Sequence, residues 1–372
     1  MRNIIYFSGL NGLRAIASLS VLFSHTTLCL NEFGLDRYVF GVYPDGSIIS
    51  TQLAGYGVSI FFALSGFLIT YLLLEEKKIR PISLKNFYIR RILRIWPLYY
   101  MYLLLSLLTI WLYNLPFDKS STFFFLFLSA NIPFILSNIV PLISHYWSIG
   151  VEEQFYIFWP WFIKKIPSSR ILLFTIGITL LLIVIKLICK IIEVKYNLIF
   201  PYEFIQVTRF HCMSIGAIGS VLYFQKNNYF LKTVSTYIVQ LISWVILFLA
   251  AINLFHIASV LDNEIISLIT VFLIIGQIEK KNRIINIETT FFNFLGKISY
   301  GIYIIHPLVI FYLSKFITPP SYNASSFYYI FIYATVFIST IFLAYLSYNF
   351  YEKRFLNLKK KYTIIKNSDT KQ

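Results

Sequence analysis

The chain has 372 residues, of which 58% are hydrophobic and only 13% are charged. A soluble domain carries roughly 25% charged residues, so the charge present here is too low to cover a water-exposed surface. Apolar runs recur along the whole chain, each close to the roughly 20 residues that cross a hydrocarbon core. The short alternating segments of a transmembrane β-barrel are absent from the sequence. Composition therefore predicts an all-α, polytopic membrane helix bundle.

The formal net charge of +16 suggests nucleic acid as a partner at first sight. In a membrane protein, however, lysine and arginine gather in the cytoplasmic loops, and this explanation requires no nucleic acid. The lipid bilayer is the partner that we expect. The three cysteines, Cys29, Cys189 and Cys212, are isolated and show no metal-ligand spacing, so no metal site is predicted.

Membrane-spanning helices are predicted, in chain order, at 12–30, 54–74, 92–113, 147–164, 170–192, 207–225, 236–256, 264–278, 293–316 and 326–349. The first of them lacks a cleavage site and carries ionisable residues, which indicates a retained helix rather than a signal peptide. We expect one membrane-embedded domain over residues 1–355. Residues 356–372 are expected to form a short basic cytoplasmic tail, which is mobile after Lys359.

The apolar stretch at 121–140 decides the topology, because it is hydrophobic enough to cross the membrane. The basic residues cluster in 75–91, 164–170, 226–235, 279–292 and the tail from 350. The positive-inside rule requires that these basic segments all lie on the cytoplasmic side. They do so only if the stretch 121–140 does not cross the membrane. We therefore expect ten spans with the N- and C-termini both cytoplasmic. Residues 121–140 would then form a re-entrant or interfacial segment, whose backbone must be covered by protein.

The first predicted helix carries Arg14 and His25, which lie eleven residues apart. This spacing is close to three helical turns, so both side chains face the same side, roughly 16 Å apart along the axis. An ionisable group at membrane depth costs at least about 2.5–3.5 kcal/mol on insertion scales. A single buried histidine is commonly structural, but sharing a face with an arginine favours a functional role for His25.

The third predicted helix opens with FYIRRILRIWPLYY, which places Arg91 and Arg94 on one face and Arg90 beside them. A topology anchor at the membrane edge explains one or two of these arginines. It explains Arg94 less well, because this residue lies a turn inside the apolar run. Paired guanidinium groups at a helix mouth are suited to binding phosphates bidentately.

The fourth predicted helix begins HYWSIGVEEQFYIFWP, with Trp147, Ser148 and the adjacent carboxylates Glu152 and Glu153. Two adjacent carboxylates that enter a membrane helix cannot both face lipid, so at least one must pair with a base or reach an aqueous cavity. Arg209, near the outer end of the sixth helix, is the expected counter-ion for one of them. For Arg209, a structural ion pair remains as good an interpretation as a role in catalysis.

The ninth predicted helix contains Ser299, Tyr303 and His306 at i, i+4 and i+7 spacing. This spacing forms one polar stripe along the helix, which predicts that the three side chains line a cavity. His306 precedes a proline, so binding the carbonyl that the proline leaves free is the structural alternative for its side chain.

Six stretches of the chain together resemble the acyltransferase-3 family of membrane O-acyltransferases. They are NGLRAIASLSVLFSH, GVSIFFALSGFLIT, FYIRRILRIWPLYY, HYWSIGVEEQFYIFWP, RFHCMSIGAIGSVLY and ISYGIYIIHPLV, in this order. The R-x10-H element of the family falls on Arg14 and His25, and its R-x-x-R element falls on Arg91 and Arg94. The W-S-x-x-V-E-E-Q-F element falls on 147–155, and the histidine of the ninth-helix motif falls on His306.

The resemblance implies an enzyme, an O-acyltransferase of a bacterial inner (plasma) membrane with several passes. It would move an acyl group, by default acetyl, from cytosolic acyl-CoA (acetyl-CoA), which is a co-substrate; no tightly bound cofactor is expected. The acceptor would be a hydroxyl of an extracytoplasmic glycan or glycolipid, such as lipopolysaccharide O-antigen or exopolysaccharide. Some relatives carry an appended esterase-like domain. This chain ends soon after its tenth predicted helix, so it is expected to complete the transfer alone or with a separate protein.

In this interpretation the nucleotide phosphates bind Arg90, Arg91, Arg94 and Arg14, and the pantetheine arm threads towards His25. A histidine suits the base, because its reference pKa of about 6.5 is near neutral pH. Glu152 or Glu153 would orient the imidazole, and Ser148, Tyr303 or Arg209 would donate to the oxyanion. A covalent acyl-histidine intermediate stays open as the other route.

A proton-coupled transporter or a lipid or glycolipid flippase is the alternative function, because intramembrane Arg, Glu and His also mark ion paths. No inverted repeat or pair of broken helices supports it. A purely structural role leaves the buried charges unexplained.

Overall fold

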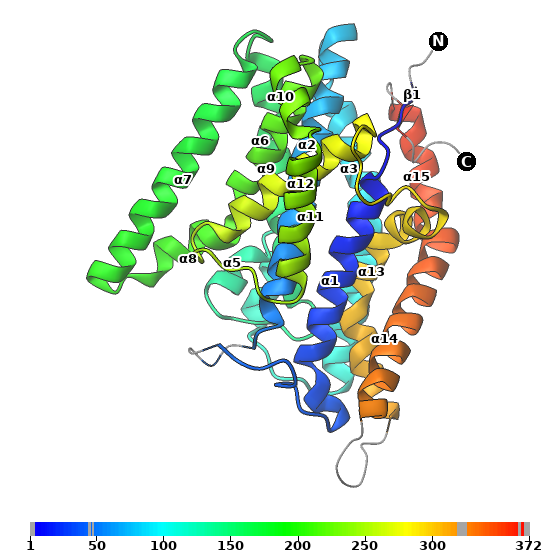
Figure 1. Ribbon diagram of the computed structural model, residues 1–372. Helices are drawn as coiled ribbons and strands as arrows, with labels where there is room; N and C mark the ends of the chain where they lie inside the picture. Colours follow the sequence, from blue (N-terminus) through cyan, green and yellow to red (C-terminus); the bar gives the residue numbers. More distant parts are fainter. Residues whose placement is uncertain (1–3, 44–45, 47, 318–325, 364–365, 368–372) are drawn as a thin grey trace.

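The computed structural model describes residues 4–43, 46, 48–317, 326–363 and 366–367, and it is a bundle of helices (Figure 1). The longer helices are α1 Leu10–Leu28, α2 Thr51–Ile79, α3 Leu84–Leu112, α6 Trp147–Lys165, α7 Ile171–Tyr196, α9 Phe210–Phe224, α11 Tyr237–Ala251, α12 Asp262–Glu279, α13 Thr290–Phe316 and α14 Ser326–Ser347. Each predicted range overlaps one of them, so the helical prediction is confirmed. By length and composition, five described helices suffice to cross a membrane, or six if the bent pair of α10 (Asn228–Val234) and α11 counts as one span.

Both ends of the chain lie at the same end of the bundle. The two-residue strand β1 (Ile4–Ile5) pairs in parallel with β2 (Lys366–Asn367). Figure 1 shows β1 just above the start of α1, and we call this end of the bundle the terminal end. The chain thus returns to the side from which it starts.

Helix α2 occupies the centre of the bundle, whereas α7 and α14 form its edges. In the most apolar 18-residue window of α2, 78% of the residues are buried. In the corresponding windows of α7 and of the helical stretch Ser326–Tyr362, which begins with α14, only 22% are buried. Figure 1 shows α7 leaning away from the other helices at one side. A hydrophobic helix that leaves most of its side chains exposed is suited to contact lipid.

Helices α2 and α9 cross at backbone contact. A Cβ atom on Gly66 of α2 would lie 1.9 Å from the carbonyl oxygen of Met213, and one on Gly216 of α9 would lie 2.1 Å from that of Ala63. Small residues allow this approach between membrane helices, where dispersion and packing drive association. The two glycines therefore fix the position of α2 against α9.

Replacing Gly66 by Ala is expected to lower the thermal unfolding midpoint of the purified protein markedly. The new methyl group meets a backbone oxygen, which cannot rotate away, and overpacking of this kind costs about 1–3 kcal/mol or more. Gly177→Ala on α7 is the matched control, because a Cβ there meets no atom of the described residues within 4 Å. Equal midpoints for the two variants would contradict the close crossing.

The segment predicted at 121–140 is not one continuous helix. It forms two short helices, α4 (Thr122–Leu126) and α5 (Asn131–Ile135), separated by a turn. The hydroxyl of Tyr99 donates to the carbonyl of Phe125 at 2.7 Å, and that of Tyr100 donates to the carbonyl of Leu126 at 2.9 Å. Such bonds satisfy irregular backbone that water does not reach. The structure is therefore consistent with a segment that does not cross.

The first part of the predicted tail, which begins at residue 356, packs on the bundle as far as Thr363. After α14 the chain makes a π-helical turn at Tyr348–Glu352, then α15 (Lys353–Lys359) and a short 3₁₀ helix at Lys360–Tyr362. Helix α15 contacts α3. Residues 364–365 and 368–372 of the predicted tail lie outside the described residues.

Two further short elements lead into longer helices of the bundle. Helix α8 (Ile199–Thr208) follows α7 after Asn197, which has a φ of 53° and turns the chain sharply. A 3₁₀ turn at Ser144–Tyr146 leads into α6. Helix α5 contacts both α6 and α8, so the 121–140 segment is held between them.

Candidate functional site

A cavity opens at the terminal end and runs into the bundle between α2, α3, α6 and α13. Along α2 its lining extends from Glu76 to Val58, a length of about 27 Å at the rise of an α-helix. Many residues predicted from the sequence as site residues line this one cavity: Arg14, Arg90, Arg91, Arg94, Ser148, Glu152, Ser299 and Tyr303. Residues far apart in the chain thus meet where the sequence predicts a binding site.

The cavity is cationic at its mouth. Its lining includes five basic and two acidic side chains, a formal excess of three positive charges: Arg14, Arg90, Arg91, Arg94, Lys359, Glu76 and Glu152. Positive charge in a narrow space with low-dielectric walls attracts polyanions. The chemistry of this mouth fits a phosphorylated ligand.

The arginines of α3 differ in what they contact. Arg90 donates to Glu76 at 3.1 Å and to the backbone carbonyl of Tyr362 at 3.0 Å, so it joins α2, α3 and the C-terminal segment. The Arg91 guanidinium lies over the rings of Phe87 and Tyr156, at 5.6 and 5.1 Å from their centroids. Its Nε is buried and has no hydrogen-bond partner among the described residues. Arg90 therefore positions the mouth, and Arg91 lines the cavity with its guanidinium packed on two rings.

The adjacent carboxylates of α6 point in different directions. Glu152 faces the cavity, where the hydroxyls of Ser65 and Tyr156 both donate to its Oε1. Glu153 is buried against α3 and accepts from Nε1 of Trp96 at 3.0 Å. The prediction that at least one carboxylate reaches a cavity is confirmed for Glu152.

Two hydroxyls close the inner end of the cavity. Ser148 of α6 and Tyr303 of α13 lie 2.5 Å apart, oxygen to oxygen, and Tyr303 donates to the carbonyl of His145 at 2.9 Å. Ser299 lines the same wall one turn earlier on α13 and donates to the carbonyl of Gly296 at 2.9 Å. Ser299 and Tyr303 of the predicted stripe therefore line the cavity, whereas His306 is fully buried, is not among the described lining residues and contacts a backbone carbonyl instead.

His25 lies beyond this inner end and is not among the described residues that line the cavity. Gly57, next to Val58 at the inner end, lies so close to α1 that an added Cβ would meet Ala17 and Val21. His25 follows Val21 by one turn of α1, which is roughly 6 Å. Tyr303, which lines the cavity, has its ring 6.2 Å from the ring of His306, the direct neighbour of His25. The passage to His25 that the sequence leads us to expect is thus not open in this conformation.

His25 belongs to a cluster of three histidines inside the bundle. Its Nδ1 lies 2.6 Å from Nε2 of His306, which is fully buried. The ring of His145 lies 5.2 Å from that of His306 and 5.5 Å from that of Tyr303. A line of rings therefore connects the inner end of the cavity with His25.

The contacts of His306 assign the proton positions in the neutral pair. Nδ1 of His306 lies 3.2 Å from the carbonyl oxygen of Ile302, which can only accept, so this nitrogen carries the proton. Nε2 of His306 then accepts from Nδ1–H of His25. The lone pair of His25 is consequently on Nε2, on the side of the ring away from His306. This arrangement orients a base.

Arg209 does not pair with Glu152 or Glu153, so this part of the prediction is wrong. It ends α8 and donates instead to the carbonyls of Gln206 and Gly55, at 3.0 and 2.9 Å, and to Asn263 Oδ1 at 3.1 Å. The chain turns at Arg209, between α8 and α9, where φ is 44°. This turn directs the side chain towards α2 and α12 rather than towards α6.

Trp147 and Arg209 lie together beside the cavity but are not among its described lining residues. The Arg209 guanidinium lies 5.4 Å from the centroid of the Trp147 ring, which stacks on Phe134 of α5 at 5.3 Å. Trp147 thereby links the 121–140 segment to α6. The two residues therefore pack outside the lining, next to the inner end of the cavity.

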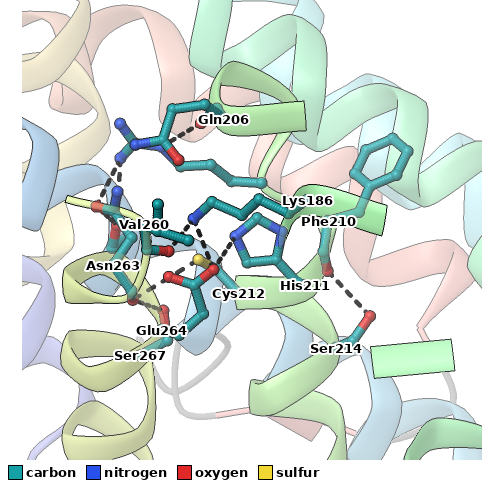
Figure 2. A network of polar contacts seen from close by, with 12 residues as sticks. Lys186, Gln206, Phe210, His211, Cys212, Ser214, Val260, Asn263, Glu264 and Ser267 are labelled. Atoms are coloured by element: carbon teal, nitrogen blue, oxygen red, sulfur yellow. Dashed lines mark hydrogen bonds and ion pairs between the residues drawn. The ribbon is translucent and has the colours of Figure 1, made fainter. Parts of the chain in front are cut away.

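A second polar cluster, shown in Figure 2, lies between α7, α9 and α12, where the sequence did not lead us to expect one. Lys186 is fully buried and donates to Glu264 at 2.7 Å and to the carbonyl of Val260 at 2.5 Å. Nε2 of His211 lies 3.1 Å from the same Glu264 oxygen. The signal was a lysine within the apolar run IVIKLICK, which needs a buried partner. This ion pair attaches α7 to the bundle.

Two residues that contact Glu152 were also missed. Ser65 lies in the matched stretch GVSIFFALSGFLIT, and Tyr156 lies one turn after Glu152 on α6. A hydroxyl in an apolar run is common, so neither residue carries a strong signal by itself. Their position became clear only when α2 and α6 were placed side by side.

Comparison with known proteins shows which family the chain resembles. The family model described as "Acyltransferase domain" (acyltransferase-3) matches residues 7–349. The chain is 31% identical over 193 residues to "Peptidoglycan O-acetyltransferase OatA" of Listeria monocytogenes, covering 47% of this chain and 28% of that protein. It is 28% identical over 377 residues to "Putative O-acetyltransferase SACOL0978" of Staphylococcus aureus, covering 94% of this chain and 57% of that protein. No solved structure matches.

The chain spans 57% or less of the length of these two relatives. The match from residue 7 to residue 349 nevertheless includes every helix that contributes to the cavity, apart from α15. The chain therefore belongs to the acyltransferase-3 family.

Proposed function

We propose that the protein is a membrane O-acyltransferase that moves an acyl group, acetyl by default, from cytosolic acyl-CoA to a hydroxyl of an extracytoplasmic glycan. The observation that carries the proposal is the cavity with a cationic mouth and a hydroxyl-lined inner end, in a chain of the acyltransferase-3 family. A polyanionic donor with a long, thin, neutral arm matches such a shape.

The proposal includes a topology of ten spans with both termini in the cytoplasm, in the plasma membrane of a bacterium. The pairing of β1 with β2 supports it, because an even number of spans returns the chain to its starting side. The basic loops also support it, since they gather at the end where the cavity opens. The cationic mouth then faces the cytosolic pool of acyl-CoA.

The donor is held in two parts. Arg91, Arg94 and Arg14 bind the nucleotide phosphates at the mouth, and Arg90 holds the surrounding elements in place. Guanidinium groups suit this role because they donate bidentately to phosphate oxygens. The pantetheine arm lies along α2 towards Ser148 and Tyr303.

Transfer takes place at His25. The acceptor hydroxyl gives its proton to Nε2 of His25 as its oxygen bonds to the acyl carbon, and the carbon–sulfur bond then breaks and releases CoA as the thiolate. Because Ser148 and Tyr303 close the inner end, their hydroxyls must separate before the thioester passes. Once separated, they can donate to the oxyanion.

The names of the relatives favour peptidoglycan as the acceptor among the glycans that the sequence left open. The Listeria relative is named for peptidoglycan. Lipopolysaccharide O-antigen and exopolysaccharide, given as examples from the sequence resemblance, remain acceptors for the same chemistry, since each offers sugar hydroxyls outside the membrane.

The test is thiol release by inside-out vesicles that contain the protein. With acetyl-CoA outside and a glycan acceptor inside, the vesicles are expected to release free CoA thiol in proportion to the acetylated acceptor. Vesicles without the protein are the control. Acceptor-dependent proton flux without thiol release would instead indicate the transporter. Mass spectrometry of peptidoglycan and of surface polysaccharide, from cells with and without the gene, then identifies the acceptor.

A further inference from the structure

The C-terminal segment reaches the cavity although it lies beyond the family match. The match ends at residue 349, whereas Lys359 of α15 and Thr363 belong to the cavity lining. By composition alone these residues belong to a tail without a role. In the fold they sit at the mouth, next to the arginines of α3.

The segment is fixed at several points. Arg90 donates to the carbonyl of Tyr362 at 3.0 Å, and the hydroxyl of Tyr351 donates to the carbonyl of Pro97 in α3 at 3.2 Å. Beyond Thr363, β2 pairs with β1. Arg90 also binds Glu76, so one guanidinium holds the end of α2 and the C-terminal segment together. These contacts build a wall of the mouth.

We propose that this segment completes the donor site and that Lys359 binds the 3′-phosphate of CoA, an inference that rests on the proposed function. The thioester arm enters the cavity first, so the nucleotide stays at the mouth. Lys359 ends α15 one turn before Tyr362, whose carbonyl accepts from Arg90 near the start of α3, whereas Arg94 lies a turn further along α3. The pyrophosphate next to the arm therefore meets the arginines, and the ribose phosphate meets the lysine.

The side-chain types agree with this division. A phosphate monoester carries a charge of about −1.5 to −2 at neutral pH, and a compact ammonium group binds it as a point charge. The planar forks of two arginines suit the diphosphate bridge. Lys359 thus supplies a cation for a group that the arginines do not reach.

The experiment measures binding of CoA and of 3′-dephospho-CoA to the purified full-length chain in lipid nanodiscs by calorimetry. Lys359→Gln is expected to weaken CoA binding about tenfold, the worth of one charge-assisted contact, and to leave dephospho-CoA binding unchanged. Lys359→Arg is expected to restore most of the affinity. Lys361→Gln is the matched control, because Lys361 is an exposed lysine of the same segment with the same loss of charge.

The outcomes separate this inference from the proposed function. Wild-type protein that binds CoA together with a Lys359→Gln variant that binds it equally well would overturn the inference alone. Equal weakening of both nucleotides would also overturn it, because Lys359 would then act on the mouth as a whole. Wild-type protein that binds neither nucleotide would contradict the donor site itself. An unchanged unfolding midpoint shows that each variant is folded.

Discussion

Replacing His25 by Ala is expected to abolish acyl transfer while the protein still inserts and still binds CoA. His25 is the proposed base, and in the assigned tautomers its Nε2 holds the lone pair that the contact within the His25–His306 pair does not use. Loss of a general base lowers the rate by a factor on the order of 10²–10⁴. CoA binding is unaffected because His25 lies beyond the inner end of the cavity. Thiol release and calorimetry measure the two properties separately. Substantial transfer by the variant would remove His25 as the base.

His306→Phe tests the assignment of the proton positions. Phenylalanine keeps a ring at this position but offers no acceptor to Nδ1–H of His25, so the imidazole loses its orientation. We expect kcat to fall about tenfold or more with KM for acetyl-CoA unchanged. His256→Ala is the control; this histidine is 52% exposed at its side chain and binds Asp262 at 2.7 Å, away from the cluster. A kcat equal to that of wild type would contradict the assigned proton positions.

The helices could be predicted because each apolar run carries its own signal. Residues at i, i+4 and i+7 share a face whatever surrounds the helix, so the stripe of Ser299 and Tyr303 was found from spacing alone. The same argument placed Arg91 with Arg94. A shared face near a helix mouth then predicts a cavity, and the structure brings these residues together.

The contacts between helices could not be predicted in the same way. Arg209 was expected to pair with a carboxylate of α6 because both lay at the same depth. Depth does not fix which helices are neighbours, and the turn at Arg209 aims its side chain at α2 and α12. Lys186 and Glu264 were both visible in the sequence, yet nothing local joins residues 78 positions apart.

Polar composition does not reveal how the C-terminal segment packs. Residues 356–372 are basic and few in number, which is typical of a tail, and mobility was expected after Lys359. Its order depends on single bonds from distant residues, such as that from Arg90 to the Tyr362 carbonyl. Such bonds leave no periodic pattern, so this wall of the mouth was found only in the folded structure.

Changing Arg91 and Arg94 together to Ala is expected to weaken CoA binding by a factor on the order of 10²–10⁴, because two charge-assisted contacts of about 1.5–3 kcal/mol each are lost. Acceptor binding is expected to change little, because the proposed acceptor arrives from the extracytoplasmic side, whereas both arginines line the donor cavity. Calorimetry in nanodiscs measures the loss. Unlike the Lys359 substitution, this change weakens CoA and dephospho-CoA alike.

Arg80→Ala is the matched control for this pair, because Arg80 is exposed at the end of α2, on the same side of the bundle, and is not among the described residues that line the cavity. Arg90 is unsuitable as a control, since its loss would release Glu76 and the Tyr362 carbonyl and disturb the whole mouth. If the double variant binds CoA as tightly as wild type, Arg91 and Arg94 are topology anchors. In that case the excess positive charge of the mouth serves membrane orientation, and the donor must enter the bundle elsewhere.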